Sequence, residues 1–312
     1  MAAPIVLVMT GFLYDRRSEW GAGFEIMGPE AISTQLDPTI ADRVEIVVNA
    51  GEAMEEAVLN SLPNLRLVAC FSTGYAGIDL AYLRSRGIEL TTAAGINAHD
   101  VADHAIALML AWWHAIPRAD GAVRKGMWRG ALGHRRSLKG KAAGIVGLGR
   151  IGREIARRAD VLGMRVSWWG PREKPDAGYP RASSLHDLAR RSDVLLVSSR
   201  ATAENFGQID EEVIRALGPQ GLLVNVSRGF LVDEPALLRA LSDGTLGGAA
   251  LDVFAQEPLN TKQWAGLDNV VLTPHVAGYT LEAGHDMFGQ LRDNILRYLE
   301  GRPLLTPVRD PG

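Results

Sequence analysis

The sequence feature that most constrains the fold is a glycine-rich turn, GIVGLGRIG, at Gly144 to Gly152. It follows an apolar run, Lys141 to Val146, that predicts a buried strand. It precedes an amphipathic pattern, Arg153 to Leu162, that predicts a helix, and a second strand is expected at Met164 to Trp169. The order of strand, glycine turn, helix and strand is that of a βαβ unit, in which the two strands are parallel.

The glycines of this turn have the spacing that a dinucleotide requires. Gly147 allows the tight turn, Gly149 lets the backbone approach a pyrophosphate, and Gly152 lets the helix pack close to the strand. The helix N-terminus offers N–H groups and the positive end of its dipole to the anion. A glycine turn without a ligand is the alternative, but the flanking strand and helix patterns favour a dinucleotide site.

Charge and histidine spacing exclude several kinds of partner. The 312 residues suffice for two domains, and the formal net charge of −3 gives no reason to expect nucleic-acid or anionic-membrane binding. The basic stretch Arg118 to Lys141 has no interleaved aromatic residue except Trp128, so a solvated connector is expected there. His99, His104 and His114 share one helical region without metal-ligand spacing, so they are expected to be core or surface histidines, and no metal is expected.

Cysteine usage and hydropathy favour a cytoplasmic protein. Cys70, the single cysteine, lies in an apolar run and is expected to be a buried thiol rather than a nucleophile. The segment Met1 to Thr10 lacks a basic leader and is expected to be a strand, not a signal peptide. The longest apolar run, Ala105 to Trp113, is too short to span a bilayer.

Alternating strand and helix patterns before the glycine turn predict a first parallel sheet. The expected strands are Ile5 to Met9, Arg43 to Val48 and Arg66 to Phe71, and the expected helices are Glu52 to Asn60 and Asp79 to Arg86. A long apolar helix, Val101 to Ile116, is then expected to stop before Pro117, with a polar connector from Arg118 to Gly140.

A second alternating series begins at Lys141 and fits a doubly wound, dinucleotide-binding sheet. Its strands are expected near residues 142–146, 164–169, 193–197, 221–226, 247–251 and 270–272, and a last helix at Leu281 to Leu299. This helix could return the chain to the first domain. The predicted division is therefore 1–96 plus 281–312 as a discontinuous substrate domain and 97–280 as the dinucleotide-binding domain, with the active site in the cleft between them.

Three segments after the glycine turn each place a chemically useful residue just past an expected strand. They are Arg228, Glu257 and His275, and Asp252 lies at a strand end before Glu257. Taken singly, Arg228 is explained as a surface cation, Glu257 as a loop charge and His275 as one of seven histidines. Strand ends of an open α/β sheet converge on one crevice, so together they favour a reaction site.

These residue types suit hydride transfer to a 2-keto acid. Imidazolium can protonate the carbonyl oxygen, and a carboxylate behind it favours its charged form and fixes its orientation. A guanidinium holds a carboxylate and a carbonyl through a planar fork that lysine does not offer. The cofactor supplies the hydride.

Over nearly its whole length the sequence resembles the D-2-hydroxyacid dehydrogenases. The matching segments are Ser72 to Asp79, Val101 to Ala105, Gly144 to Gly152, Val224 to Gly229, Val232 to Glu234, Leu251 to Pro258 and Thr273 to Gly278. The resemblance implies two Rossmann-like or flavodoxin-like domains with parallel sheets. It also implies a homodimer built in part by the Val101 helix and the connector that carries Trp128.

The resemblance assigns a role to each candidate residue. It implies Arg228 as the substrate-binding arginine, Glu257 as the partner of the histidine, and His275 as the acid–base residue. Backbone N–H groups around Thr73 and Gly74 are implied to hold the substrate carboxylate, and Asp252 to approach the nicotinamide amide.

The second strand of the βαβ unit departs from the NAD-binding pattern. An acid usually ends this strand and accepts from the ribose hydroxyls, but here Trp169 is followed by Gly170-Pro171-Arg172-Glu173-Lys174. Arg172 and Lys174 favour a 2′-phosphate, so NADPH is the preferred cofactor and NAD stays possible, with Glu173 as the missing acid. The expected cofactor contacts are Gly147, Gly149, Arg150, Ile151, Gly152, Arg172, Arg200, Thr202, Ser227, Asp252 and Gly278.

Within the family the chain is most similar to glyoxylate/hydroxypyruvate reductases and hydroxyphenylpyruvate reductases. The sequence therefore predicts reduction of small 2-keto acids to D-2-hydroxy acids. Two alternatives stay open: an NAD(P)-sensing, corepressor-like binding protein, and a dehydrogenase of another anion such as phosphite.

Overall fold

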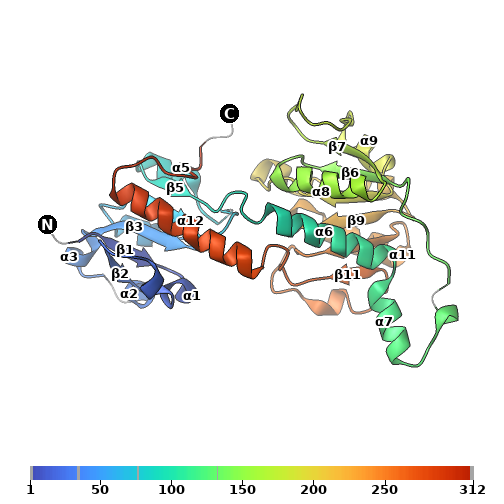
Figure 1. The fold of residues 1–312 in the computed structure, drawn as a ribbon, viewed down its shortest axis with the longest axis horizontal. Coiled ribbons are helices and arrows are strands. Elements are labelled where there is room, and N and C mark those ends of the chain that lie inside the picture. The colour runs from blue at the N-terminus through green and yellow to red at the C-terminus, as the bar shows by residue number, and fades with distance from the viewer. Residues whose placement is uncertain (1–2, 34–35, 76, 132, 310–312) are drawn as a thin grey trace. The chain divides into compact units, whose positions relative to one another are not determined.

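The computed structural model describes residues 3–33, 36–75, 77–131 and 133–309, so Ala76 of the first family-like segment lies outside the described residues. The chain divides into two compact units, unit 1 (Met1–Ile96 with Thr280–Gly312) and unit 2 (Asn97–Tyr279) (Figure 1). Each unit has its own parallel sheet, which confirms the predicted α/β class with two parallel sheets. The expected cleft between two domains, and the division of roles between them, stay predictions.

The sheet of unit 1 has the strand order β2-β1-β3-β4-β5, all parallel, which is the flavodoxin-like order. Its strands are β1 (Ile5–Val8), β2 (Glu25–Met27), β3 (Val44–Asn49), β4 (Leu67–Cys70) and β5 (Glu89–Thr91). The three inner strands are the three expected from the sequence, and they are almost wholly buried. Cys70, at the end of β4, is a buried free thiol as expected.

Helices cover both faces of this sheet. They are α1 (Gly11–Tyr14), α2 (Glu30–Ser33), α3 (Pro38–Ala41), α4 (Glu56–Asn60), α5 (Leu80–Ser85) and α12 (Leu281–Leu299). Successive strand residues point to opposite faces, so Val6 and Val8 of β1 share a core with Ile295 of α12, whereas Ile5 and Leu7 face the other core. The C-terminal helix thus completes the core of unit 1.

The sheet of unit 2 has six parallel strands in the order β11-β10-β9-β8-β6-β7. They are β6 (Ala142–Val146), β7 (Arg165–Trp169), β8 (Val194–Val197), β9 (Leu222–Asn225), β10 (Gly248–Leu251) and β11 (Val270–Leu272), each at its expected position. Strand β6 pairs with β7 on one side and with β8 on the other. This change of direction creates the crevice at the carboxyl ends of β6 and β8 where such sheets bind ligands.

Helices also cover both faces of the second sheet. They are α6 (Ala98–Trp113), α8 (Arg150–Val161), α9 (Leu185–Arg190), α10 (Glu211–Leu217) and α11 (Glu234–Asp243), and unit 2 also contains α7 (Ile116–Arg124). Ile145 of β6 lies in the core under α6 and α8, and its neighbour Val146 lies in the core under α9, α10 and α11. None of the helices in the described ranges is both long and apolar enough to cross a membrane.

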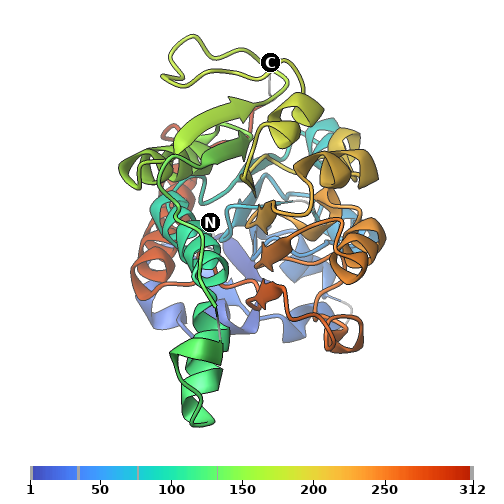
Figure 2. The same cartoon turned by 90° about the vertical axis from the view of Figure 1, so that its right-hand side faces the viewer.

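The predicted connector after α6 was partly wrong, because Pro117 lies in the first turn of a second helix and the connector begins only after that helix. Helix α6 ends at Trp113, and Ala115 turns the chain with a left-handed φ of 51°. Helix α7 then starts at Ile116, with Pro117 in its first turn, where a missing N–H costs no hydrogen bond. In Figures 1 and 2, α7 extends from the end of α6 away from the sheet of unit 2.

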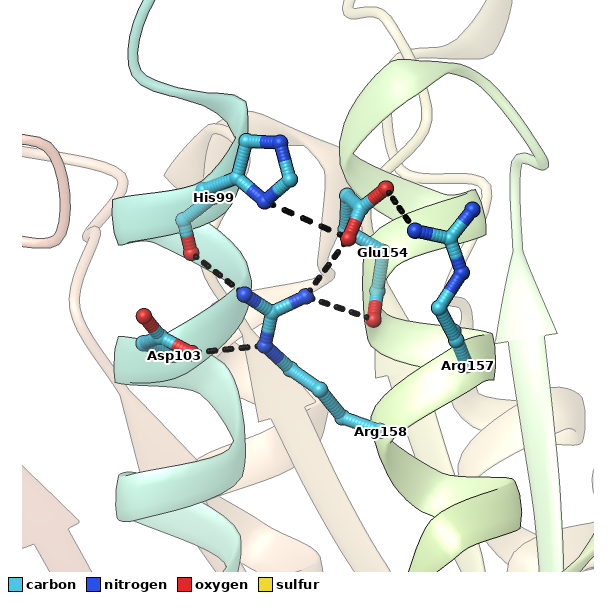
Figure 3. A network of polar contacts seen from close by, with 5 residues as sticks. All are labelled: His99, Asp103, Glu154, Arg157 and Arg158. Atoms are coloured by element: carbon cyan, nitrogen blue, oxygen red, sulfur yellow. Dashed lines mark hydrogen bonds and ion pairs between the residues drawn. The ribbon is translucent and has the colours of Figure 1, made fainter.

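A polar network fastens α8 to α6 (Figure 3). Arg158 donates from Nε to Asp103 at 2.6 Å and from Nη1 to the Glu154 carboxylate at 2.8 Å. His99 Nδ1 lies 3.3 Å from one oxygen of Glu154, and Arg157 donates to the other at 2.9 Å. The network fixes α8, whose N-terminus follows the glycine turn, against α6.

Candidate active site

The glycine turn packs against the loop that follows β8. Gly147 has a left-handed φ of 87°, and a Cβ atom at this position would lie 2.5 Å from the Cα atom of Ser199. A Cβ atom at Gly152, in the first turn of α8, would lie 2.0 Å from the Gly147 carbonyl oxygen. Only glycine therefore fits at both positions, as the sequence indicated.

Gly149 differs from these two glycines because it borders open space. It is the N-cap residue of α8, and no heavy atom lies within 4 Å of the position of its missing Cβ. Arg150 and Ile151 follow as the first residues of the helix. Open space at the start of a helix, beside a glycine, fits a pyrophosphate, which the helix N–H groups and dipole would bind.

The loop after β9 carries Arg228 and is held by a buried asparagine. The Asn225 side chain accepts from the Ser227 N–H at 3.0 Å and donates to the Arg228 carbonyl oxygen at 3.0 Å. The Ser227 hydroxyl donates to the Ser199 carbonyl oxygen at 2.6 Å, so the loops after β8 and β9 are joined. Burial lowers the pKa of Arg228 below its usual value, and the nearby Glu257 charge opposes that effect.

The loop after β10 directs Glu257 toward the same region. A Cβ atom at Gly229 would lie 1.8 Å from the carbonyl carbon of Phe254, so the loops after β9 and β10 touch backbone to backbone. The Phe254 N–H donates to Oε1 of Glu257 at 3.0 Å, and the Ala255 N–H donates to Glu234 at 2.8 Å. Oε2 of Glu257 is left to face the next loop.

His275, in the loop after β11, meets that oxygen. Its Nδ1 atom lies 2.7 Å from Oε2 of Glu257, and 45% of its side chain is exposed. Its Nε2 atom makes no hydrogen bond to any described residue. The structure thus brings Glu257 and His275 together beside Arg228, with one imidazole nitrogen oriented by the carboxylate and the other without a partner among the described residues.

Asp252 holds the His275 loop at several points. Its buried carboxylate accepts from the Thr273 hydroxyl at 2.6 Å and from the N–H groups of Val276 and Ala277, each at 2.9 Å. The His275 N–H donates to the Asp252 carbonyl oxygen at 2.8 Å. Burial acts to raise the pKa of Asp252, but the side chains of His104 and Thr273 and the two N–H groups outweigh it, so the pKa lies below its usual value.

This anchoring fixes an uncommon backbone conformation. His275 has a φ of 56°, a left-handed value that non-glycine residues adopt only where their surroundings enforce it. Sequence reasoning missed one part of the anchor, because it treated His104 only as a core or surface histidine. His104 Nε2 lies 2.9 Å from the Thr273 hydroxyl oxygen, which accepts from it while donating its own hydrogen to Asp252.

The remaining cofactor candidates lie at the same edge of the unit 2 sheet or beside it. Arg172 is exposed in the loop after β7, and Arg200 is exposed in the loop after β8. The Thr202 N–H donates to the Asn205 side chain at 2.8 Å. A Cβ atom at Gly278 would lie 2.2 Å from Nδ2 of Asn97, so the Asn97 side chain packs directly against this glycine.

Thr73 and Gly74 belong to unit 1, just after β4. The Ser72 hydroxyl donates to the Gly74 carbonyl oxygen at 2.5 Å, which shapes this loop. The N–H groups of Thr73 and Gly74 donate to no residue that the structure describes. Within the same ranges, no three side chains of the His, Cys, Asp and Glu types gather as metal ligands do.

Comparison with known proteins places this geometry in context. The family model described as "D-isomer specific 2-hydroxyacid dehydrogenase, NAD binding domain" matches residues 106–277. The chain is 40% identical over 264 residues to glyoxylate/hydroxypyruvate reductase A of Arabidopsis thaliana, with 84% of each chain covered. It is equally identical, over the same length and shares, to hydroxyphenylpyruvate reductase of Plectranthus scutellarioides.

Two solved structures are similar along the whole chain. A 2-hydroxyacid dehydrogenase from Ketogulonicigenium vulgare has a TM-score of 0.89 and 36% identity, with 99% of each chain covered. An NADPH-dependent glyoxylate/hydroxypyruvate reductase from Sinorhizobium meliloti, in complex with NADP and malonate, has a TM-score of 0.88 and 32% identity. That alignment covers 98% of this chain and 97% of the other.

Proposed function

Because the chain belongs to the D-isomer specific 2-hydroxyacid dehydrogenase family, we propose that it reduces small 2-keto acids to D-2-hydroxy acids with NADPH. Glyoxylate and hydroxypyruvate are the expected substrates. The observation that carries the proposal is the contact of 2.7 Å between His275 Nδ1 and Glu257, beside the partly buried Arg228. A carboxylate, an imidazole and a guanidinium are the groups that carbonyl reduction of a keto acid requires.

Arg228 binds the substrate in this proposal. Its guanidinium offers parallel N–H donors, which suit a carboxylate and its adjacent carbonyl oxygen, and its partial burial strengthens their electrostatic attraction. One Nη atom already donates to the Ser227 carbonyl oxygen at 2.7 Å, which limits the rotation of the side chain. The N–H groups of Thr73 and Gly74 serve as further donors to the substrate carboxylate.

His275 donates the proton. Glu257 binds Nδ1, so the hydrogen on the exposed Nε2 atom is the one that passes to the carbonyl oxygen as the carbonyl carbon is reduced. The bound nicotinamide supplies the hydride. Glu257 stabilises the imidazolium before the transfer and keeps the ring oriented afterwards.

The cofactor is held by the crevice of unit 2. Gly147, Gly149 and Gly152, with the first residues of α8, accommodate the pyrophosphate. The preference for NADPH is supported by the end of β7, where Trp169 and Gly170 replace the acid of NAD-binding proteins and Arg172 follows. Arg200, Thr202, Ser227, Asp252 and Gly278 complete the proposed cofactor site.

The chain also has a surface suited to a homodimer. Ile116 and Val123 of α7 are each 55% exposed, and Trp128 is 76% exposed. Large apolar side chains exposed along one segment are typical of protein contacts. A second copy of the chain is the proposed partner, and the cytoplasmic location stays a prediction from the sequence.

Steady-state oxidation of NADPH and NADH tests the proposal. The substrates are glyoxylate, hydroxypyruvate, pyruvate and 4-hydroxyphenylpyruvate. Turnover with a lower KM for NADPH than for NADH is the expected result. Cofactor binding without turnover of any keto acid would contradict it and favour a sensing protein or a dehydrogenase of another anion.

A further inference from the structure

The turn after β7 carries an acid where the proposed cofactor needs positive charge. Residues 170–174 directly follow β7, at the edge where sheets of this kind read the adenosine ribose. Glu173 lies between Arg172 and Lys174, and its side chain is 85% exposed. A carboxylate free to approach a 2′-phosphate would repel it.

A short segment beside β7 brings another cation to this turn. The Trp168 N–H donates to the Pro180 carbonyl oxygen at 3.0 Å, and the Ala182 N–H donates to the Trp168 carbonyl oxygen at 2.8 Å. Arg181 therefore pairs with Trp168 in a parallel bridge. The Trp168 indole N–H also donates to the Tyr179 carbonyl oxygen at 3.0 Å. These bonds fix the backbone of Arg181 next to the end of β7.

The Arg181 guanidinium contacts the turn at two points. Its Nη2 atom donates to the Gly170 carbonyl oxygen at 2.7 Å, and its Nη1 atom lies 3.6 Å from Oε1 of Glu173. The side chain lies over the Trp168 ring, 5.8 Å from its centroid, and is 32% exposed. An exposed ion pair adds little to stability, so its main effect is on where the Glu173 charge lies.

The other acid of this loop is paired in the same way. Arg153, in the first turn of α8, binds the Asp176 carboxylate at 3.0 Å and the Asp176 carbonyl oxygen at 3.2 Å. Both carboxylates of residues 170–178 are thus held by an arginine from a flanking element. Lys174, by contrast, forms no ion pair with any residue in the described ranges.

We propose that Arg181 is a cofactor-specificity residue, which holds the Glu173 carboxylate away from a 2′-phosphate bound at the end of β7. This inference rests on the proposed preference for NADPH. Arg181 acts through Glu173, and its hydrogen bond to the Gly170 carbonyl oxygen keeps the guanidinium at the turn. Arg172 and Lys174 then supply the positive charge that the phosphate meets.

Calorimetric titration with NADP⁺ and with NAD⁺ tests the inference in four forms of the protein: wild type, Arg181→Ala, Glu173→Gln and the double variant. Arg181→Ala is expected to weaken NADP⁺ binding about tenfold, the effect of one partly screened unit charge near a phosphate, and to leave NAD⁺ binding nearly unchanged. Glu173→Gln in the Arg181→Ala background is expected to restore NADP⁺ binding, because no charge is then released. Arg165→Ala, at the opposite end of β7, is the matched control, and thermal unfolding shows that each variant folds.

The outcomes separate this inference from the proposed function. A wild type that binds NAD⁺ as tightly as NADP⁺ contradicts the cofactor proposal itself. A wild type that prefers NADP⁺, with the preference kept in Arg181→Ala, contradicts this inference alone. If Arg181→Ala loses the preference but Glu173→Gln does not restore it, the role assigned to Glu173 is wrong.

Discussion

Replacing Asp252 by asparagine tests whether its carboxylate holds the His275 loop. The carboxylate accepts from the Thr273 hydroxyl and the Val276 N–H on Oδ1, and from the Ala277 N–H on Oδ2. An amide of the same shape presents one NH₂ group in place of an oxygen. At least one donor then faces another donor inside the protein.

The expected loss of stability follows from these contacts. A lost hydrogen bond to a charged group costs about 1.5–3 kcal/mol, and a buried N–H left without an acceptor costs about 1–3 kcal/mol more. Asp252→Asn is therefore expected to lower the free energy of unfolding by about 2.5–6 kcal/mol. Urea denaturation followed by tryptophan fluorescence measures this loss. Thr273→Val removes the hydroxyl that donates to Asp252 and accepts from His104, and it is the milder comparison at about 1–2 kcal/mol.

The same variant has a pH signature. The pKa of Asp252 is lower in the folded chain than its usual value of 3.8, so the stability that its ionised carboxylate contributes is fully present above that pH. The contribution is lost as the pH falls through the folded-state pKa. The difference between wild type and Asp252→Asn is therefore expected to be large at pH 7 and to shrink below about pH 4. Equal denaturation midpoints at pH 7 would refute this account of the loop.

Three further predictions test the cofactor loop, the helix network and the C-terminal helix. Gly152→Ala should abolish NADPH binding because its Cβ would lie 2.0 Å from a backbone oxygen. Gly149→Ala should fold normally and bind NADPH more weakly, and fluorescence titration with NADPH distinguishes the two variants. Arg158→Met should lower the free energy of unfolding by about 1–2 kcal/mol, measured in urea, since it breaks the network of Figure 3. Burial, with the charge of Glu45, raises the pKa of Tyr298 to about 12, so wild type should lose more thermal stability than Tyr298→Phe as the pH rises above about 10.

The buried strands of unit 2 were predictable because each is a short apolar run bounded by polar residues or glycine. Arg228, Glu257 and His275, which follow β9, β10 and β11, were predictable as a group because parallel strands bring their carboxyl ends to one edge of the sheet. The contact between Glu257 and His275 matches that expectation. The strands β2 and β5 were not expected, because three residues at a sheet edge leave too little pattern.

Two features had no local signal. The break between α6 and α7 depends on the left-handed φ of Ala115, a conformation that alanine does not indicate, whereas Pro117 suggested a stop two residues later. The part that His104 takes in anchoring the His275 loop depends on its contact with Thr273, which is 169 residues away along the chain. Periodicity assigned His104 to a helix but contained no information about that partner.

The claim that His275 delivers the proton in keto-acid reduction is tested by the kcat of His275→Ala with hydroxypyruvate and saturating NADPH. The kcat is expected to fall about 10²–10⁴-fold, the usual contribution of a general acid. The dissociation constant for NADPH, from fluorescence titration, is expected to stay near the wild-type value, because His275 lies outside the glycine turn and the end of β7. A variant that binds NADPH and keeps wild-type kcat would contradict the claim.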